Sequence, residues 1–281
     1  MTTMAKFGAE WSAALRRGSD AELRRWLEVA QAACDEADEI ARQHFRRDLV
    51  IETKPDKTFV TQADTAIERL IRERLTDAFP DHGLVGEEYG VEASDAPIRW
   101  YIDPIDATHN FMRGVPLFGT LLAAERDDEL QVGVMSAPAL GERWWAHRGG
   151  GAWASTRGGD PRRIRVSDVS RLDDAHVLYG SGRDIMESGL APGFEGLLRL
   201  VWRDRGFGDF WGYALIAEGA AEAMIEADLK SWDAAAPTML VEEAGGRVTD
   251  FDGKRGVARG TIIATNGLLH ETVRMALLGR R

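Results

Sequence analysis

The chain has 281 residues, 44% of them hydrophobic, which is enough for one large domain or two halves with a sizeable core. Its 46 acidic residues outnumber the 35 Lys and Arg, and the formal net charge of −11 argues against nucleic acid and anionic membranes as main partners. The single cysteine, Cys34, excludes an internal disulfide and a cysteine-based zinc site. Because Cys34 lies in a helical pattern, we interpret it as a small packed residue rather than a nucleophile.

Neither membrane insertion nor export is expected. No apolar run reaches the length of a membrane span, and residues 1–18 lack the apolar core of a signal peptide. We therefore expect a cytoplasmic enzyme without a membrane partner.

The first half of the chain is predicted to form two helices and then closely spaced strands. Residues 20–47 carry apolar groups at helical spacing, with Ser19 and Glu22 as a capping box ahead of them. A second helix is predicted from about residue 62 to residue 78, stopped by Phe79 and Pro80. Strands are predicted over 99–102, 117–125, 131–136, 142–147 and 151–155, with a polar hairpin turn at 126–129.

The second half alternates between strands and helices. Strands are predicted over 175–180, 221–226 and 260–265, and helices over 211–219, 232–244 and 268–278. Hairpins followed by such alternation predict an α/β fold of layered sheets and helices rather than a simple doubly wound sheet. We expect one domain over 1–281, with a metal and nucleophile half at 1–170 and a substrate-side half at 171–281.

Residues 100–108, Trp-Tyr-Ile-Asp-Pro-Ile-Asp-Ala-Thr, form the most informative segment. Pro104 lacks an N–H group, so the apolar strand is expected to end there, with Asp103 and Asp106 in the turn beyond it. Two close carboxylates repel each other unless cations lie between them, which predicts a site for hard metal ions. The alternative is a capping turn in which Asp106 is the N-cap of a following helix.

Further carboxylates lie at the ends of predicted elements, where a fold can bring them together. Asp64 and Asp233 each begin a helix, where a first-turn acid or an N-cap is the alternative interpretation. Glu87 and Glu88 follow a short apolar stretch, and the alternative there is a solvated loop. Glu226 ends a predicted strand.

These candidate ligands all carry oxygen, and the six histidines are scattered. Oxygen-only sites suit Mg²⁺, Mn²⁺ or Ca²⁺ rather than zinc, and bound Mg²⁺ would reverse the field of a site that otherwise repels phosphate. Thr108 lies where a helix N-terminus would offer N–H groups to a phosphate. The sequence contains no Gly-x-x-x-x-Gly-Lys-Ser/Thr loop. Together these features predict metal-assisted hydrolysis of a phosphate ester.

Four blocks resemble, in order, signatures of the inositol monophosphatase family. They are residues 60–64 (Val-Thr-Gln-Ala-Asp), 86–88 (Gly-Glu-Glu), 103–111 (Asp-Pro-Ile-Asp-Ala-Thr-His-Asn-Phe) and 232–246, which begins Trp-Asp and ends Glu-Ala-Gly-Gly. The resemblance covers residues 20–280. It implies the αβαβα sandwich of inositol monophosphatases and fructose-1,6-bisphosphatases, dependence on two or three Mg²⁺ ions, and a homodimer.

The resemblance also implies roles for individual residues. Asp64 and Thr108 would orient the attacking water, and the backbone of Ala107 and Thr108 would contact the phosphate. Ala107 replaces the family's glycine; it fits if its φ is negative, whereas a positive φ brings strain of about 1 kcal/mol or more. The implied metal ligands are Glu87, Asp103, Asp106, Asp233 and the carbonyl of Ile105.

Within the family, the chain most resembles the actinobacterial histidinol-phosphate phosphatases. The similar segments are residues 53–56, 134–138, 143–146, 208–210 and 264–270. Asp209 and Glu226 align with positions that contact the leaving group, where carboxylates would favour the cationic end of histidinol phosphate. Solvated strand ends are the alternative for both residues.

Two other functions remain open from the sequence alone. One is an inositol or sugar monophosphatase of broad specificity. The other is a catalytically silent metal or phosphate binder, suggested by Ala107 and opposed by the intact carboxylates and Thr108.

Overall fold

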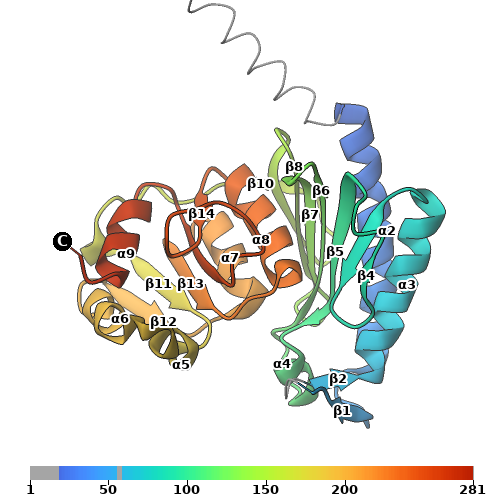
Figure 1. The fold of residues 1–281 in the computed structure, drawn as a ribbon, viewed down its shortest axis with the longest axis horizontal. Helices are drawn as coiled ribbons and strands as arrows, with labels where there is room; N and C mark the ends of the chain where they lie inside the picture. Colours follow the sequence, from blue (N-terminus) through green and yellow to red (C-terminus); the bar gives the residue numbers. More distant parts are fainter. Residues whose placement is uncertain (1–18, 56–58, 281) are drawn as a thin grey trace, which may run out of the picture.

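Two long helices form the outer layer of the larger half of the molecule. The protein is described by a computed structural model covering residues 19–55 and 59–280, in which α2 (Asp20–His44) and α3 (Gln62–Ala78) lie side by side on one face of a sheet (Figure 1). The Ser19 hydroxyl accepts the Glu22 N–H at 3.2 Å, but the Glu22 carboxylate pairs with Arg126, so only the Ser19 half of the predicted capping box forms. Cys34 is fully buried on α2, and burial raises the pKa of its thiol to about 12, as expected of a packed residue.

The larger sheet has eight strands, antiparallel except for one parallel pair, β3–β5. A two-residue turn, Asp127-Asp128, joins β6 to β7 with both residues at positive φ, as a tight hairpin requires. The five strands predicted in the first half form within a few residues of their expected bounds, whereas β3, β4 and β10 were not predicted. In spatial order the strands are β10 (Arg162–Ile164), β9 (Gly151–Thr156), β8 (Glu142–His147), β7 (Glu129–Ala137), β6 (Gly119–Arg126), β5 (Ile98–Asp106), β3 (Gly83–Gly86) and β4 (Gly90–Glu92).

A second sheet of five strands lies across the molecule from the first (Figure 1). Its order is β12 (Arg203–Arg205), β11 (His176–Tyr179), β13 (Ala223–Ala227), β15 (Thr261–Thr265) and β14 (Arg247–Thr249). Along β13, Met224 packs into the cluster between the sheets, whereas Ala223 and Ile225 pack into the outer cluster, as strand alternation requires.

The remaining helices complete five layers. Between the two sheets lie α7 (Asp209–Ala217) and α8 (Ser231–Glu243), and the outer face of the smaller sheet is covered by α5 (Gly182–Ile185), α6 (Ala191–Leu198) and α9 (His270–Leu277). The layered fold expected from the sequence is therefore confirmed, in the order αβαβα. The other described elements are the hairpin β1 (Ile51–Thr53) and β2 (Phe59–Thr61), the short helix α4 (Thr108–Met112), a 3₁₀ turn (Leu172–Asp174) and a π turn (Met186–Leu190).

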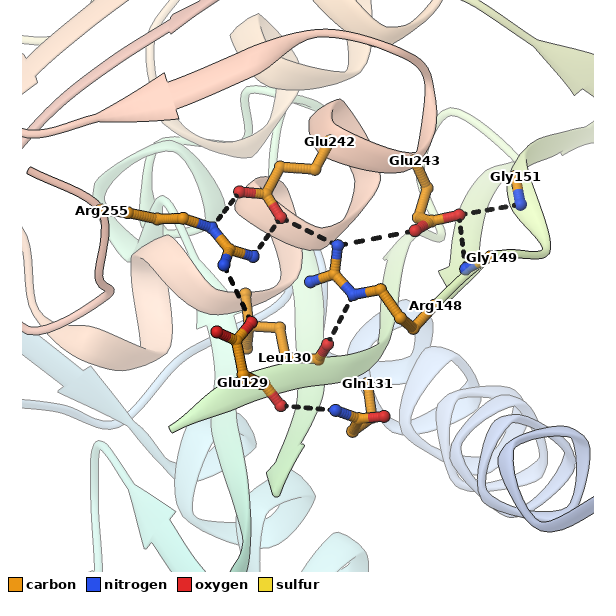
Figure 2. A network of polar contacts seen from close by, with 9 residues as sticks. All are labelled: Glu129, Leu130, Gln131, Arg148, Gly149, Gly151, Glu242, Glu243 and Arg255. Carbon is orange, nitrogen blue, oxygen red and sulfur yellow. Dashed lines mark hydrogen bonds and ion pairs between the residues drawn. The ribbon is translucent and has the colours of Figure 1, made fainter. Parts of the chain in front are cut away.

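Helix α8 is buried along most of its length, and ion pairs fix its C-terminal end. Arg148 bonds to Glu242 at 3.1 Å, while Arg255 joins Glu242 to Glu129 at the start of β7 (Figure 2). Glu243 accepts two backbone N–H groups from the turn between β8 and β9. The helix that carries Asp233 near its first turn is thus attached to the larger sheet at its other end. Within residues 19–55 and 59–280, no helix is both long and apolar enough to cross a membrane.

Candidate active site

A bulge in β5 brings Asp103 and Asp106 to the same side of the sheet. The predicted end of the strand before Pro104 is wrong, because β5 continues to Asp106. Asp103 pairs with Leu121 and Asp106 with Gly119, so β5 advances three residues while β6 advances two. A regular strand would point residues three apart to opposite faces, and the extra residue of a bulge cancels that alternation. The bulge also accommodates Pro104, which has no N–H to offer the ladder.

Three carboxylates converge beyond this bulge. Asp103, Asp106 and Asp233 each offer an oxygen, and these oxygens all lie within 4.8 Å of one another. Asp103 is 2% exposed, and its Oδ1 atom has no hydrogen-bond partner among the described residues. Burial and the neighbouring carboxylates raise the pKa of Asp103 and Asp106 well above the usual range, and burial raises the pKa of Asp233 to about 7. Such a set of buried, repelling oxygens fits a hard divalent cation.

The alternative capping roles coexist with this cluster. Asp233 is the third residue of α8, and its Oδ2 atom accepts the Lys230 N–H at 2.8 Å. Asp106 accepts the Phe210 N–H at the start of α7 at 2.9 Å, and Ala107 rather than Asp106 is the N-cap of α4. These bonds fix the orientation of both carboxylates.

Glu87 joins the site from the end of β3. Its Oε1 atom receives the Lys54 ammonium at 2.8 Å, and the same ammonium contacts Glu88 at 2.7 Å. The Lys54 ammonium therefore places a positive charge beside Glu87. Burial raises the pKa of Glu88 to about 7. Segment 53–56 was singled out in the sequence, but its last residue, Asp56, lies outside the described residues.

Asp64 and Thr108 meet beside the carboxylate cluster. The Thr108 hydroxyl lies 3.4 Å from Asp64 Oδ1 and 3.0 Å from the carbonyl oxygen of Ile105. Asp64 is fully buried, and its Oδ2 atom accepts both the N–H and the hydroxyl of Thr61, at 2.9 and 2.5 Å, in a capping box that begins α3. Burial raises the pKa of Asp64 to about 6.

Ala107 adopts the left-handed conformation, with φ 63° and ψ 48°. This is the strained alternative of the two that the sequence left open. A left-handed conformation costs an L-residue roughly 1–2 kcal/mol, whereas glycine adopts it freely.

Glu226 and Asp209 form the opposite wall. Glu226 is the penultimate residue of β13 and is 5% exposed, and burial together with the Asp209 charge raises its pKa to about 8. Its two oxygens accept the Asp209 N–H at 3.2 Å and the Tyr213 hydroxyl at 2.5 Å. Asp209 has a φ of 57°, and burial raises its pKa as well.

One cavity of about 280 Å³ joins both walls. Its lining includes the predicted site residues except Asp64, which reaches it through Thr108, and the candidate Glu88, which bonds to Lys54 instead. Two residues had no predicted role, because their contacts join separate elements of the fold: Tyr213 lines the cavity and bonds to Glu226, and Lys54 bonds to Glu87. The other lining residues without a predicted role are Phe59, His109, Ser181, Asp184, Phe210, Ala227, Asp228 and Leu229.

Comparison with known proteins places the chain among phosphatases. The family model described as "Inositol monophosphatase family" matches residues 22–278. The chain is 46% identical to the histidinol-phosphatase of Mycobacterium tuberculosis over 88% of this chain and 95% of that protein. The histidinol-phosphatase of Streptomyces coelicolor is 45% identical over 87% and 94%. The crystal structure of extragenic suppressor protein suhB from Bartonella henselae has a TM-score of 0.83 and 30% identity, covering 90% of this chain and 98% of that one.

Proposed function

Because the chain belongs to the inositol monophosphatase family, whose members hydrolyse phosphate monoesters, we propose that it is a Mg²⁺-dependent histidinol-phosphate phosphatase. The observation that carries the proposal is a single cavity with two acidic walls, one suited to metal ions and the other to a cationic leaving group. Similarity to histidinol-phosphatases over most of the chain supports this substrate over inositol or sugar phosphates.

The metal wall consists of Glu87, Asp103, Asp106, Asp233 and the carbonyl of Ile105. The Oδ1 atom of buried Asp103 has no partner in the described part of the chain, and this atom and the mutual repulsion of the carboxylates support occupation by two or three Mg²⁺ ions. When bound, Mg²⁺ supplies positive charge that neutralises the phosphate and activates water.

Thr108 and Asp64 orient the attacking water in this proposal. A hydroxyl that donates its hydrogen to Asp64 Oδ1 keeps its oxygen lone pairs for a water in the cavity. Asp64 cannot turn away, because the N–H and hydroxyl of Thr61 hold its other oxygen. With a pKa of about 6, Asp64 is ionised at neutral pH and able to accept a proton. The backbone at Ala107 and Thr108 contacts the phosphate.

The substrate wall distinguishes histidinol phosphate from neutral esters. The substrate carries an ammonium and an imidazole, and Asp209 and Glu226 face it from one side of the cavity. Burial raises the pKa of both carboxyl groups in the free protein, and a bound ammonium lowers it again, because an opposite charge favours the ionised form. A charge-assisted hydrogen bond contributes roughly 1.5–3 kcal/mol, so Glu226→Gln and Asp209→Asn should each lower kcat/KM for histidinol phosphate about ten- to hundredfold. A neutral ester should lose much less. An unchanged ratio between the two substrates would show that these carboxylates do not bind the amine.

Metal dependence is tested by releasing phosphate from histidinol phosphate before and after chelation. Excess chelator should abolish turnover, and Mg²⁺ added back should restore it. Full turnover in excess chelator would contradict the metal mechanism. We also propose a homodimer, which rests on the family resemblance and which sedimentation would test, and a cytoplasmic location.

A further inference from the structure

Helix α7 holds Glu226 by both of its carboxylate oxygens. The Asp209 N–H bonds to Oε1 at 3.2 Å, and the Tyr213 hydroxyl bonds to Oε2 at 2.5 Å. Asp209 and Tyr213 are four residues apart, so they lie on one face of the helix, a single turn from each other. The carboxylate is thus held by two groups of a single rigid element.

Two glycines lie so close to the Glu226 carboxylate and to each other that neither position has room for a side chain. A Cβ atom at Gly180, just beyond β11, would lie 2.2 Å from Glu226 Oε1. A Cβ atom at Gly208, just before α7, would lie 2.5 Å from the Cα atom of Gly180. The ends of β11 and β13 and the start of α7 therefore meet at Glu226 with no room for another side chain.

Tyr213 is suited to holding a carboxylate in the charged form. Its side chain is 1% exposed, and a bond of 2.5 Å is in the range of O–H···O⁻ bonds. Each carboxylate oxygen has two acceptor sites, so one bond to each oxygen leaves Glu226 able to accept from a donor in the cavity that it lines.

We infer that Tyr213 is a specificity-determining positioning residue, which orients Glu226 to receive the cationic end of the substrate. The inference rests on the proposed function, because it assigns the substrate class to one wall of the same site. A tyrosine serving only the core would fill volume, whereas this one directs its hydroxyl at a carboxylate of the cavity.

The structure offers a matched control. Tyr101 is also buried, and its hydroxyl bonds to buried Glu125 at 2.7 Å, but neither residue lines the active-site cavity. Replacing either tyrosine with phenylalanine removes one hydroxyl from a buried carboxylate and keeps the ring. Only the Tyr213 variant should change substrate preference.

The experiment compares kcat/KM for histidinol phosphate with kcat/KM for p-nitrophenyl phosphate, which has no cationic group. Tyr213→Phe should lower the ratio of the two about five- to tenfold, mainly through KM for histidinol phosphate. Tyr101→Phe should leave the ratio as in the parent protein. Equal ratios in the parent and Tyr213→Phe proteins would overturn the inference while leaving the proposed function standing. Absence of histidinol phosphate turnover in the parent protein would overturn both.

A double variant tests whether Tyr213 acts through Glu226. In a Glu226→Gln background, Tyr213→Phe should change the ratio less than about twofold, because the carboxylate that it orients is gone. The double variant can be compared with Glu226→Gln even if Tyr213→Phe alone fails to fold. In both of these proteins a neutral amide replaces the Glu226 carboxylate, so loss of the Tyr213 hydroxyl leaves no buried charge without a partner. A further drop as large as in the parent background would overturn the inference.

Discussion

Replacing Asp106 with asparagine should separate activity from stability. Asparagine has nearly the same shape, and its side-chain oxygen can still accept the Phe210 N–H that Asp106 accepts at 2.9 Å. What disappears is one negative charge from a cluster whose oxygens lie within 4.8 Å of one another. Turnover should be nearly eliminated, because a neutral amide is a weaker ligand for the metal.

The increase in the free energy of unfolding that Asp106→Asn gives the metal-free protein can be estimated from the geometry. Two unit charges about 4.8 Å apart repel by roughly 3.5 kcal/mol at an effective dielectric constant of about 20. Partial protonation relieves some of this repulsion, so we expect a stabilisation of about 2–3 kcal/mol at pH 8 in chelator. That corresponds to a rise in Tm of roughly 3–5 °C for a chain of 281 residues.

The raised pKa values determine whether the stability of the metal-free protein rises or falls with pH. The folded protein raises the pKa of Asp106, and that of its neighbour Asp233 to about 7, so it binds more protons than the unfolded chain between about pH 4 and pH 7. The stability of the metal-free parent protein should therefore fall as pH rises through that window. The advantage of Asp106→Asn should be largest above pH 7 and nearly absent near pH 4.

Thermal unfolding in chelator at several pH values, paired with phosphate release in Mg²⁺, measures both effects. Asp168→Asn is the control, because the Asp168 side chain is 90% exposed and should change neither quantity. A variant that is less stable than the parent protein at pH 8 would show that the carboxylates do not repel as argued. A turnover within a few-fold of the parent would make Asp106 a cap only.

Three further predictions concern neighbouring parts of the molecule. Thr108→Val keeps the size of the side chain but removes the hydroxyl beside Asp64, so it should lower kcat more than affinity; a loss below about tenfold would mean that the metal alone orients the water. Ala107→Gly should relieve the left-handed strain and retain or raise activity, with Ala93→Gly, at φ 49° and outside the site, as a control for the backbone effect; a large loss of activity in a folded variant would show that the loop depends on the methyl group. Arg148→Met removes a partner of Glu242 and should cost about 2 kcal/mol of unfolding free energy while kcat is retained at 25 °C; denaturant unfolding identical to the parent would show that the network of Figure 2 contributes nothing.

Local patterns predicted the elements and the candidate site because both depend on short stretches of chain. Carboxylates at element ends, such as Asp64 and Asp233, could be found without knowing the fold. The order of the four blocks then indicated the family, and the αβαβα architecture followed from it.

Features set by long-range contacts could not be predicted in this way. The sequence predicts that the strand ends at Pro104, but whether a proline ends a strand or lies in a bulge depends on the partner strand, here β6. The sign of φ at Ala107 depends on how the chain leaves β5 to begin α4. Tyr213 gave no signal, because a tyrosine within an apolar helix is typical of a core residue and its partner Glu226 lies on another element.

The most direct test of the account is substrate preference in the unmodified protein. Phosphate release with Mg²⁺ should be measured for histidinol phosphate, myo-inositol 1-phosphate and a sugar phosphate on one preparation. The two acidic walls predict the highest kcat/KM for histidinol phosphate, by about tenfold or more, since the two esters without a cationic group gain nothing from Glu226 and Asp209. Equal or higher kcat/KM for the inositol or sugar phosphate would contradict the account.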